Sequence, residues 1–312
     1  MISVRYHIVS IAAVFLALAV GVVLGSSSLS ARLLESVGNE KEQLQQRAEE
    51  LGAHNERLRA QVATADHFDS SIAPMAVRGQ LDGRSVVLIS SADVPDGERE
   101  SVAEVLRDSG AELTGQVRLG ESLSDPERAA SLEGVITQLL PAGVQLPTAA
   151  DPGTQAGGLI GPLALLKQDG QSQVDDQARA AAFAGLAEGG FATASPGLRP
   201  AQLAVVLTGG QQRGEQAGDR AAILARFATQ VDAAGQGAVL AGTSGSATGS
   251  GAVGVARADP AISSSLSTVD NAGSGAGRVA VVLAAREQAE HRAGHYGTAS
   301  SAQGPVPNTP RD

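Results

Sequence analysis

The sequence predicts an α/β protein of three consecutive parts: an N-terminal transmembrane helix, a coiled-coil stalk, and a domain built on a parallel sheet. Three observations support this architecture. Residues 8–24 are apolar and uncharged, residues 34–65 carry a seven-residue repeat, and residues 85–241 alternate short apolar runs with longer helical stretches. Buried parallel strands read as short apolar runs, and the helices between them cover the two faces of the sheet.

The first part, residues 1–27, predicts a helix that crosses a membrane. As a helix, the run 8–24 spans about 26 Å, which is at the short end for a bilayer. Arg5 and the α-amine precede it, and no acid does, so we expect a cytoplasmic N-terminus and an extracytoplasmic C-terminal domain. A signal peptide cleaved near residues 25–28 is the alternative. We favour an uncleaved signal anchor, because the run is longer than the ~7–15 apolar residues usual in a signal peptide.

Residues 28–70 predict the coiled-coil stalk, because two sets of positions recur at intervals of seven and are mostly apolar. The d set is Val37, Leu44, Leu51, Leu58 and Ala65, and the a set is Leu34, Lys41, Ala48, Asn55 and Val62. The remaining positions are mostly polar, which favours a narrow seam between two helices over one helix packed on its own domain. We expect a parallel homodimer whose register Asn55 fixes. A lone stalk helix and pairing with another protein are the alternatives.

Residues 80–296 predict an α/β domain. The expected strands are 85–90, 112–119, 203–208 and 237–241, and the expected helices are 98–109, 125–140, 173–189, 218–234 and 278–290. Residues 243–254 are rich in Gly and Ser, and we expect them to form a flexible loop. Gly294 is expected to end the last helix. The tail 297–312 contains three prolines and few apolar residues, and we expect it to be disordered.

The composition argues against several classes of function. The sequence contains no cysteine, which excludes disulfides, thiolate metal sites and cysteine nucleophiles. The net charge is −10 and aromatic residues make up 2%. Nucleic acid is therefore not an expected partner, because the charge repels phosphate and few side chains could stack on bases.

Ligands of parallel sheets bind beyond the carboxyl ends of the strands, where two segments of this chain are expected. Residues 90–93, SSAD, follow the strand 85–90, and residues 208–210, TGG, follow the strand 203–208. Neither segment matches a phosphate-binding or dinucleotide-binding motif, and we interpret the glycines as a tight turn. The sequence has no G-x-S-x-G or H-E-x-x-H motif. We therefore expect no enzymatic activity and no resident cofactor.

Several segments resemble the actinobacterial MctB family of copper transport proteins. They are the start MISVRYHIVSIAAVFLALAVGVVLGSSSLS, then ATADHFD, LTGG, STVDNAGSGAGRVAVVLA and GHYGT. These segments occur in the order expected for the family and span almost the whole chain. The resemblance implies an envelope protein of copper homeostasis, described in mycobacteria as a channel of the outer membrane. Some corynebacterial relatives are instead tied to cell separation, as partners that control peptidoglycan hydrolases.

His291 and His295, in the stretch EHRAGHYGTAS, are the candidate metal ligands. Four residues apart, they would share one face of a helix. Copper(I) prefers thiolate or thioether ligands, and the chain offers only two methionines, whereas copper(II) accepts imidazole. Because Gly294 lies between the histidines and is expected to end the helix, we favour a structural domain end over a metal site.

Two functions stay open at this point. The first, which rests on the resemblance, is copper homeostasis at the envelope, with copper as a transported or weakly bound ion. The second is a membrane-anchored scaffold that binds and regulates cell-wall hydrolases or divisome proteins, which suits a stalk and an anchor. Both are non-enzymatic, and both involve a membrane, a homodimer and envelope partners.

Overall fold

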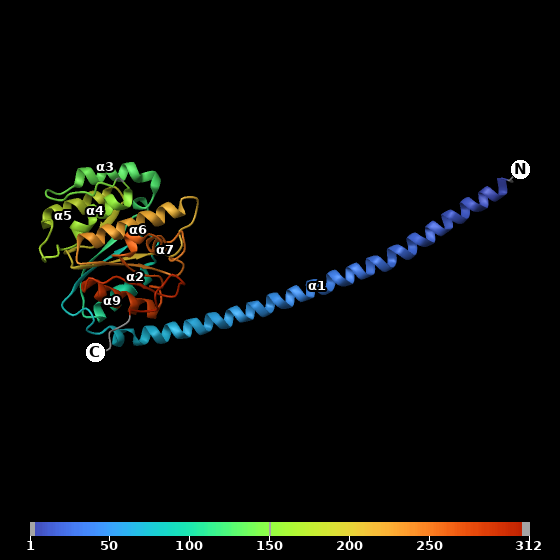
Figure 1. Ribbon diagram of the computed structural model, residues 1–312, viewed down its shortest axis with the longest axis horizontal. Helices are drawn as coiled ribbons and strands as arrows, with labels where there is room; N and C mark the ends of the chain where they lie inside the picture. The colour runs from blue at the N-terminus through green and yellow to red at the C-terminus, as the bar shows by residue number, and fades with distance from the viewer. Residues whose placement is uncertain (1–3, 150, 308–312) are drawn as a thin grey trace. The chain divides into compact units, whose positions relative to one another are not determined.

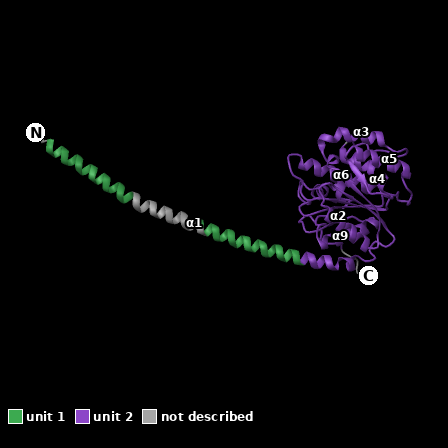
Figure 2. Ribbon diagram, turned by 180° about the vertical axis from the view of Figure 1, so that it is seen from behind, with its two compact units in different colours: residues 1–64 green, residues 65–312 purple. Residues whose placement is uncertain are grey.

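A computed structural model describes residues 4–149 and 151–307. The first described element is helix α1 (Val4–Val77). The contacts within the chain divide the protein between Thr64 and Ala65 into two units (Figure 2). The second unit holds a seven-stranded sheet that carries helices on both faces (Figure 1). The predicted α/β class is therefore confirmed.

The first unit is the part of α1 that ends at Thr64. Its segment Val4–Gly25 is long and apolar enough to cross a membrane, with a mean hydropathy of 2.8. This agrees with the predicted transmembrane helix, while its orientation stays a prediction. Further along α1, the heptad side chains Leu44, Leu51 and Leu58 are exposed in the single chain. The coiled coil that would cover them also stays a prediction.

The sheet of the second unit has the strand order β3-β2-β1-β4-β5-β6-β7, and all neighbouring strands are parallel except β2 and β3. The strands are β1 (Ser85–Ser90), β2 (Glu112–Leu119), β3 (Ala192–Ala194), β4 (Leu203–Thr208), β5 (Ala238–Gly242), β6 (Ser267–Val269) and β7 (His295–Tyr296). The predicted strands 85–90, 112–119 and 203–208 have the observed bounds. Strands β3, β6 and β7 were not predicted, because a strand of two or three residues shows no periodicity.

Two hydrophobic cores fill the space between the sheet and its helices, since successive side chains of each strand point to opposite faces. Val87 and Ile89 of β1 belong to one core, and Val86 and Leu88 belong to the other. The first core is covered by α3 (Ala129–Leu139), α4 (Pro152–Ala164), α5 (Asp176–Glu188), α6 (Ala217–Ala234), α7 (Ala252–Ala258) and α8 (Pro260–Ser263). The second is covered by α2 (Asp96–Asp108), α9 (Gly275–Ala289) and the end of α1 (Figure 1). Two 3-10 turns, Glu121–Leu123 and Pro126–Arg128, precede α3.

Helix α4 has no counterpart in the prediction, because its sequence PGTQAGGLIGPLA reads as a loop. The glycines of α4 are instead explained by its close packing against α6. A Cβ on Gly157 would lie 2.6 Å from the Cβ of Gln230, and one on Gly161 would lie 2.7 Å from the Cβ of Ala234. Glycine at these positions allows the backbones of α4 and α6 to approach closely, so tertiary contact stabilises a helix that intrinsic propensity disfavours.

The last turns of α1 belong to the domain. The carboxylate of Asp66 accepts a hydrogen bond from the N–H of Gly275 at 2.6 Å, and Arg278 donates to the hydroxyl of Ser70 at 2.7 Å. Val77 is fully buried in the second core. We expected the stalk to end at residue 70 and the domain to begin at residue 80. The compact unit instead begins at Ala65, within the helix.

The segment after β7 also differs from expectation. The carboxylate of Asp270 accepts from the N–H of Thr298 at 2.8 Å, and Gly297 donates to the carbonyl of Gly304 at 3.0 Å. Val306 packs against the second core. The prediction of disorder is thus wrong for residues 297–307, because composition does not reveal a distant hydrogen-bonding partner. Residues 308–312 lie outside the described part of the chain.

The expected loop 243–254 contains the first turn of a helix, since α7 begins at Ala252. The rest of the stretch is held by backbone bonds, among them the N–H of Gly254 to the carbonyl of Ser246 at 2.9 Å. A Cβ on Gly251 or Gly254 would overlap neighbouring backbone. The glycines therefore serve close packing in this stretch.

Candidate functional site

The strand order reverses at β1, which has β2 on one side and β4 on the other. In open α/β sheets, ligands bind in the crevice beyond the carboxyl ends of the strands at such a point. The structure brings together the two segments that the sequence analysis placed there. Ser91 donates its N–H to the carbonyl of Leu207 at 2.9 Å, and the carboxylate of Asp93 accepts from the N–H of Gly209 at 3.3 Å.

The first glycine of the TGG segment has a specific role at this point. A Cβ on Gly209 would overlap the carboxylate of Asp93. Glycine is thus required because the carboxylate approaches the backbone closely, and the tight turn expected from the sequence is not the only reason. The same carboxylate accepts from Ser91 Oγ and, at 2.8 Å, from Nε2 of Gln212.

A cavity of about 320 Å³ opens at this reversal point. The loops after β1, β2 and β4 and the beginning of α6 supply its polar side chains. These side chains are Ser91, Asp93, Glu121, Ser122, Ser124, Asp125, Gln212 and Arg220. We call this the switch-point cavity. It is the strongest candidate for a binding site in the described part of the chain, because it combines the expected topological position with a polar lining.

The charges in the switch-point cavity are unevenly satisfied. Asp93 has three hydrogen-bond donors, and the carboxylate of Asp125 accepts from the N–H of Glu127 at 3.0 Å. Arg220 is partly buried, and its Nε is buried without a hydrogen-bond partner among the residues that the structure describes. Arg220 and Gln212 were not predicted as site residues, because neither belongs to a recognisable motif.

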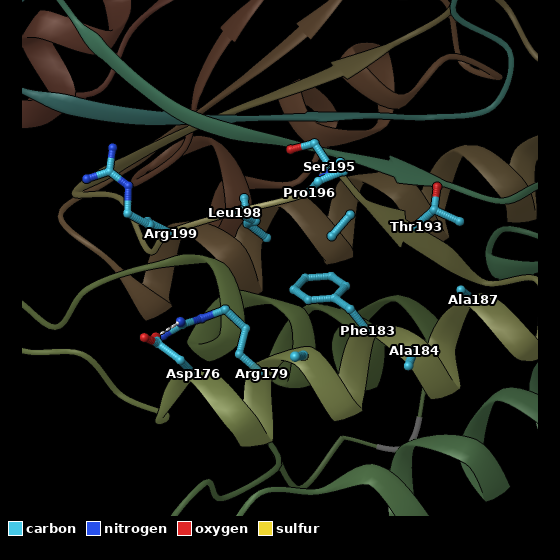
Figure 3. Close-up of a pocket in the computed structure, with 13 residues that line it drawn as sticks. Asp176, Arg179, Phe183, Ala184, Ala187, Thr193, Ser195, Pro196, Leu198 and Arg199 are labelled. Carbon is cyan, nitrogen blue, oxygen red and sulfur yellow. Dashed lines mark hydrogen bonds and ion pairs between the residues drawn. The ribbon is translucent and has the colours of Figure 1, made fainter.

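A larger cavity of about 630 Å³ lies between α5 and residues 193–199 (Figure 3). Its lining is mainly apolar and includes Phe183 and Leu198. Arg179 at its border is only 4% exposed and already has its partners. It pairs with Asp176 and donates to the carbonyls of Leu163 and Val174. Because Arg179 is occupied in this way, the cavity offers an apolar surface rather than a polar recognition site.

The histidine pair is placed differently from the expectation. Helix α9 ends at Ala289, and His291 follows with φ 57°, in the left-handed region. His291 donates its N–H to the carbonyl of Gln288, and Arg292 donates to the carbonyl of Glu287, both at 2.9 Å. These two bonds are those of a Schellman motif. The left-handed residue is thus His291 and not Gly294, so the expectation that Gly294 ends the helix is wrong.

His295 lies on another element, strand β7, and is partly buried. Its Nδ1 lies 3.0 Å from Oγ1 of Thr268. Burial and then the charge of Arg257 lower the pKa of His295, partly offset by the backbone of Ser263. The nearby guanidinium disfavours a bound cation. In residues 4–149 and 151–307, no group of three or more His, Asp or Glu side chains is arranged to hold a metal ion. Copper(II) binding by His291 and His295 stays untested.

The fold and the site define a class of protein: an α/β domain with a polar cavity at its topological switch point, preceded by one helix able to span a membrane. The sequence matches the family "Copper transport outer membrane protein, MctB" over residues 1–307. It is 39% identical over 308 residues to "Copper transporter MctB" of Mycobacterium tuberculosis strain H37Rv, covering 97% of this chain and 98% of the relative. The Mycobacterium leprae "Copper transporter MctB" is 37% identical over 291 residues, covering 91% of this chain and 92% of that protein. The chain therefore belongs to the MctB family, which confirms the resemblance noted in the sequence.

Proposed function

We propose that this protein takes part in copper homeostasis at the cell envelope, as a non-enzymatic component of copper transport. Family membership carries this proposal, because the match to copper transporters spans the apolar helix, the rest of α1 and the α/β domain. Transport, the activity in the family's name, needs no catalytic residues in the domain. Copper is the cargo in this proposal and not a resident cofactor.

The proposed arrangement is a single-pass anchor whose N-terminus is cytoplasmic and whose domain is extracytoplasmic. Two copies associate through the heptad side chains of α1, which are exposed in the single chain. The described residues hold one helix that is long and apolar enough to cross a membrane, and one such helix cannot enclose a path across it. The chain therefore acts on copper together with further copies or with other envelope proteins. Arg5, ahead of the apolar run, supports the orientation.

A dedicated copper(I) relay is not part of the proposal. The sequence has no cysteine and two methionines, of which Met75 is exposed near the end of α1. Copper(I) sites are built from several soft sulfur ligands held together. We therefore place the contribution of this chain in assembly and positioning rather than in a tight copper site of its own.

The test is a deletion strain grown with added copper, in which cellular copper is measured by mass spectrometry. We expect the deletion to change copper content and tolerance, and the full chain to restore both. Leu51→Asp with Leu58→Asp should fail to restore them, because the two charges would have to be buried in the seam. Ala53→Asp with Ala60→Asp, on the outer face of the same heptads, is the matched control and should restore both.

Unchanged copper content in the deletion strain would refute the proposal. If such cells instead failed to separate, and wall-hydrolase activity changed, the scaffold alternative would replace it. The sedimentation of the wild-type chain and of the two double variants in detergent tests the dimer separately. A wild-type chain that sediments as a monomer would remove the homodimer from the proposal but leave the copper function open to the first assay.

A further inference from the structure

The switch-point cavity plays no part in the proposed copper function, yet it has the features of a small-molecule site. It lies where the strand order reverses, beyond the carboxyl ends of β1 and β4, which is where α/β sheets bind ligands. Its volume of about 320 Å³ is at the lower end of the range for ligand pockets, so it suits a molecule of few atoms. A ligand in this cavity would go beyond the proposed copper function and would not depend on it.

Arg220 is the residue that most strongly indicates a ligand. It is the fourth residue of α6 (Ala217–Ala234), and both Arg220 and Leu224, one turn later, line the cavity. No hydrogen bond or ion pair joins its guanidinium to any residue that the structure describes, although its Nε is buried. A partly buried cation without a partner is costly. The first turns of a helix also disfavour positive charge, because the N-terminal end of the helix dipole is positive.

The carboxylates of the cavity do not serve as partners of Arg220. Asp93 is instead held by Ser91, Gly209 and Gln212, and Asp125 accepts from the N–H of Glu127. The third carboxylate of the lining, that of Glu121, is exposed and forms no ion pair with Arg220. Each carboxylate has two oxygens with room for further donors. The cavity thus offers an unpaired cation on α6 and acceptor groups on the loops after β1 and β2.

We propose that the switch-point cavity binds a small molecule that carries one acidic group together with amine or hydroxyl donors, as an amino acid does. The acidic group pairs with the guanidinium of Arg220, and the donors face the carboxylates of Asp93 and Asp125. An anion without donors would meet the three carboxylates of the lining unfavourably, and a cation would meet Arg220. A molecule with both kinds of group satisfies both sides of the cavity.

The test is isothermal titration calorimetry of the full chain in detergent with three probes. L-Serine carries the acid, the amine and the hydroxyl; acetate carries only the acid; ethanolamine carries only the amine and hydroxyl. We expect L-serine to bind at least about tenfold more tightly than either half. Arg220→Gln should weaken L-serine binding by about tenfold or more. Arg226→Gln on the same helix should not, since Arg226 is half exposed and lies 3.9 Å from Asp151 outside the cavity.

Circular dichroism establishes that each variant is folded, and Arg220→Lys provides a second variant. The lysine side chain would keep the charge without the planar fork, so L-serine should bind more weakly than to wild type but more tightly than to Arg220→Gln. The proposal is overturned if L-serine does not bind in the millimolar range, or binds equally well to Arg220→Gln. Acetate binding as tightly as L-serine would also overturn it, because the loops after β1 and β2 would then contribute no recognition.

Discussion

Replacing His291 by glycine should stabilise the protein. His291 has φ 57° and occupies the left-handed position that follows α9. The Cβ of a non-glycine residue costs about 1–2 kcal/mol in this conformation. Glycine avoids that cost but loses about 0.5–1 kcal/mol through the greater freedom of the unfolded chain. The imidazole is exposed, so little burial is lost, and we expect a net gain of about 0.5–1 kcal/mol.

Differential scanning calorimetry of the full chain in detergent measures this gain. For a domain of this size, 1 kcal/mol shifts the transition by roughly 2–4 °C, so His291→Gly should raise the transition by about 1–4 °C. His291→Ala is the matched control: it removes the imidazole but keeps a Cβ, and should change stability by no more than about 0.5 kcal/mol.

The same variants decide the role of the histidines in copper binding. If His291 only closes the helix, His291→Ala combined with His295→Ala should bind copper(II) as the wild type does in a calorimetric titration. A lower transition temperature for His291→Gly would refute the strain argument. Stoichiometric copper(II) binding by the wild type that is lost in the double variant, and that weakens below about pH 6 as imidazoles protonate, would show that the pair is a metal site.

Three further predictions concern other parts of the chain. Asp270→Asn breaks the ion pair with Arg257, which is buried because the side chains of Asp270 and Arg257 are 2% and 4% exposed. The change should cost about 3–5 kcal/mol of stability and expose residues 298–307 to limited proteolysis. The control Glu290→Gln, which disrupts exposed ion pairs, should cost less than about 1 kcal/mol. Burial raises the pKa of Asp232 to about 6 despite the N–H of Ala238, so the carboxyl contributes stability at low pH that is lost between about pH 4 and pH 6. Asp232→Asn should remove this loss, which is roughly 2–3 kcal/mol, and flatten the dependence of the transition temperature on pH; an unchanged pH profile would contradict it. A reporter fused after residue 70 should be active only outside the cytoplasm. If the mature protein instead began near Ser27, the apolar segment would be a cleaved signal peptide and not an anchor.

The elements that the sequence predicted well are those whose signal is local. The apolar run 8–24 needs only the hydropathy of consecutive residues, and it lies in the segment Val4–Gly25 of α1. The coiled coil read from the heptads stays a prediction. Strands β1 and β4 are continuous apolar runs bounded by polar residues, so their bounds were correct. The sequence also placed residues 90–93 and 208–210 at the carboxyl ends of two strands, but it predicted a structural turn there and no cavity.

The remaining features depend on residues far apart in the chain. Helix α4 exists because its glycines allow close contact with α6, and the segment after β7 is ordered because Asp270 accepts its backbone N–H groups. Arg220 becomes a candidate ligand-binding residue only where α6 meets the loops after β1 and β2. The sequence by itself determined the apolar N-terminal helix that is long enough to cross a membrane, the heptad repeat and the α/β class, since each follows from local pattern. Tertiary structure decided which charges are paired and which glycines are tightly packed, because burial and hydrogen bonding are set by neighbours that the fold brings together.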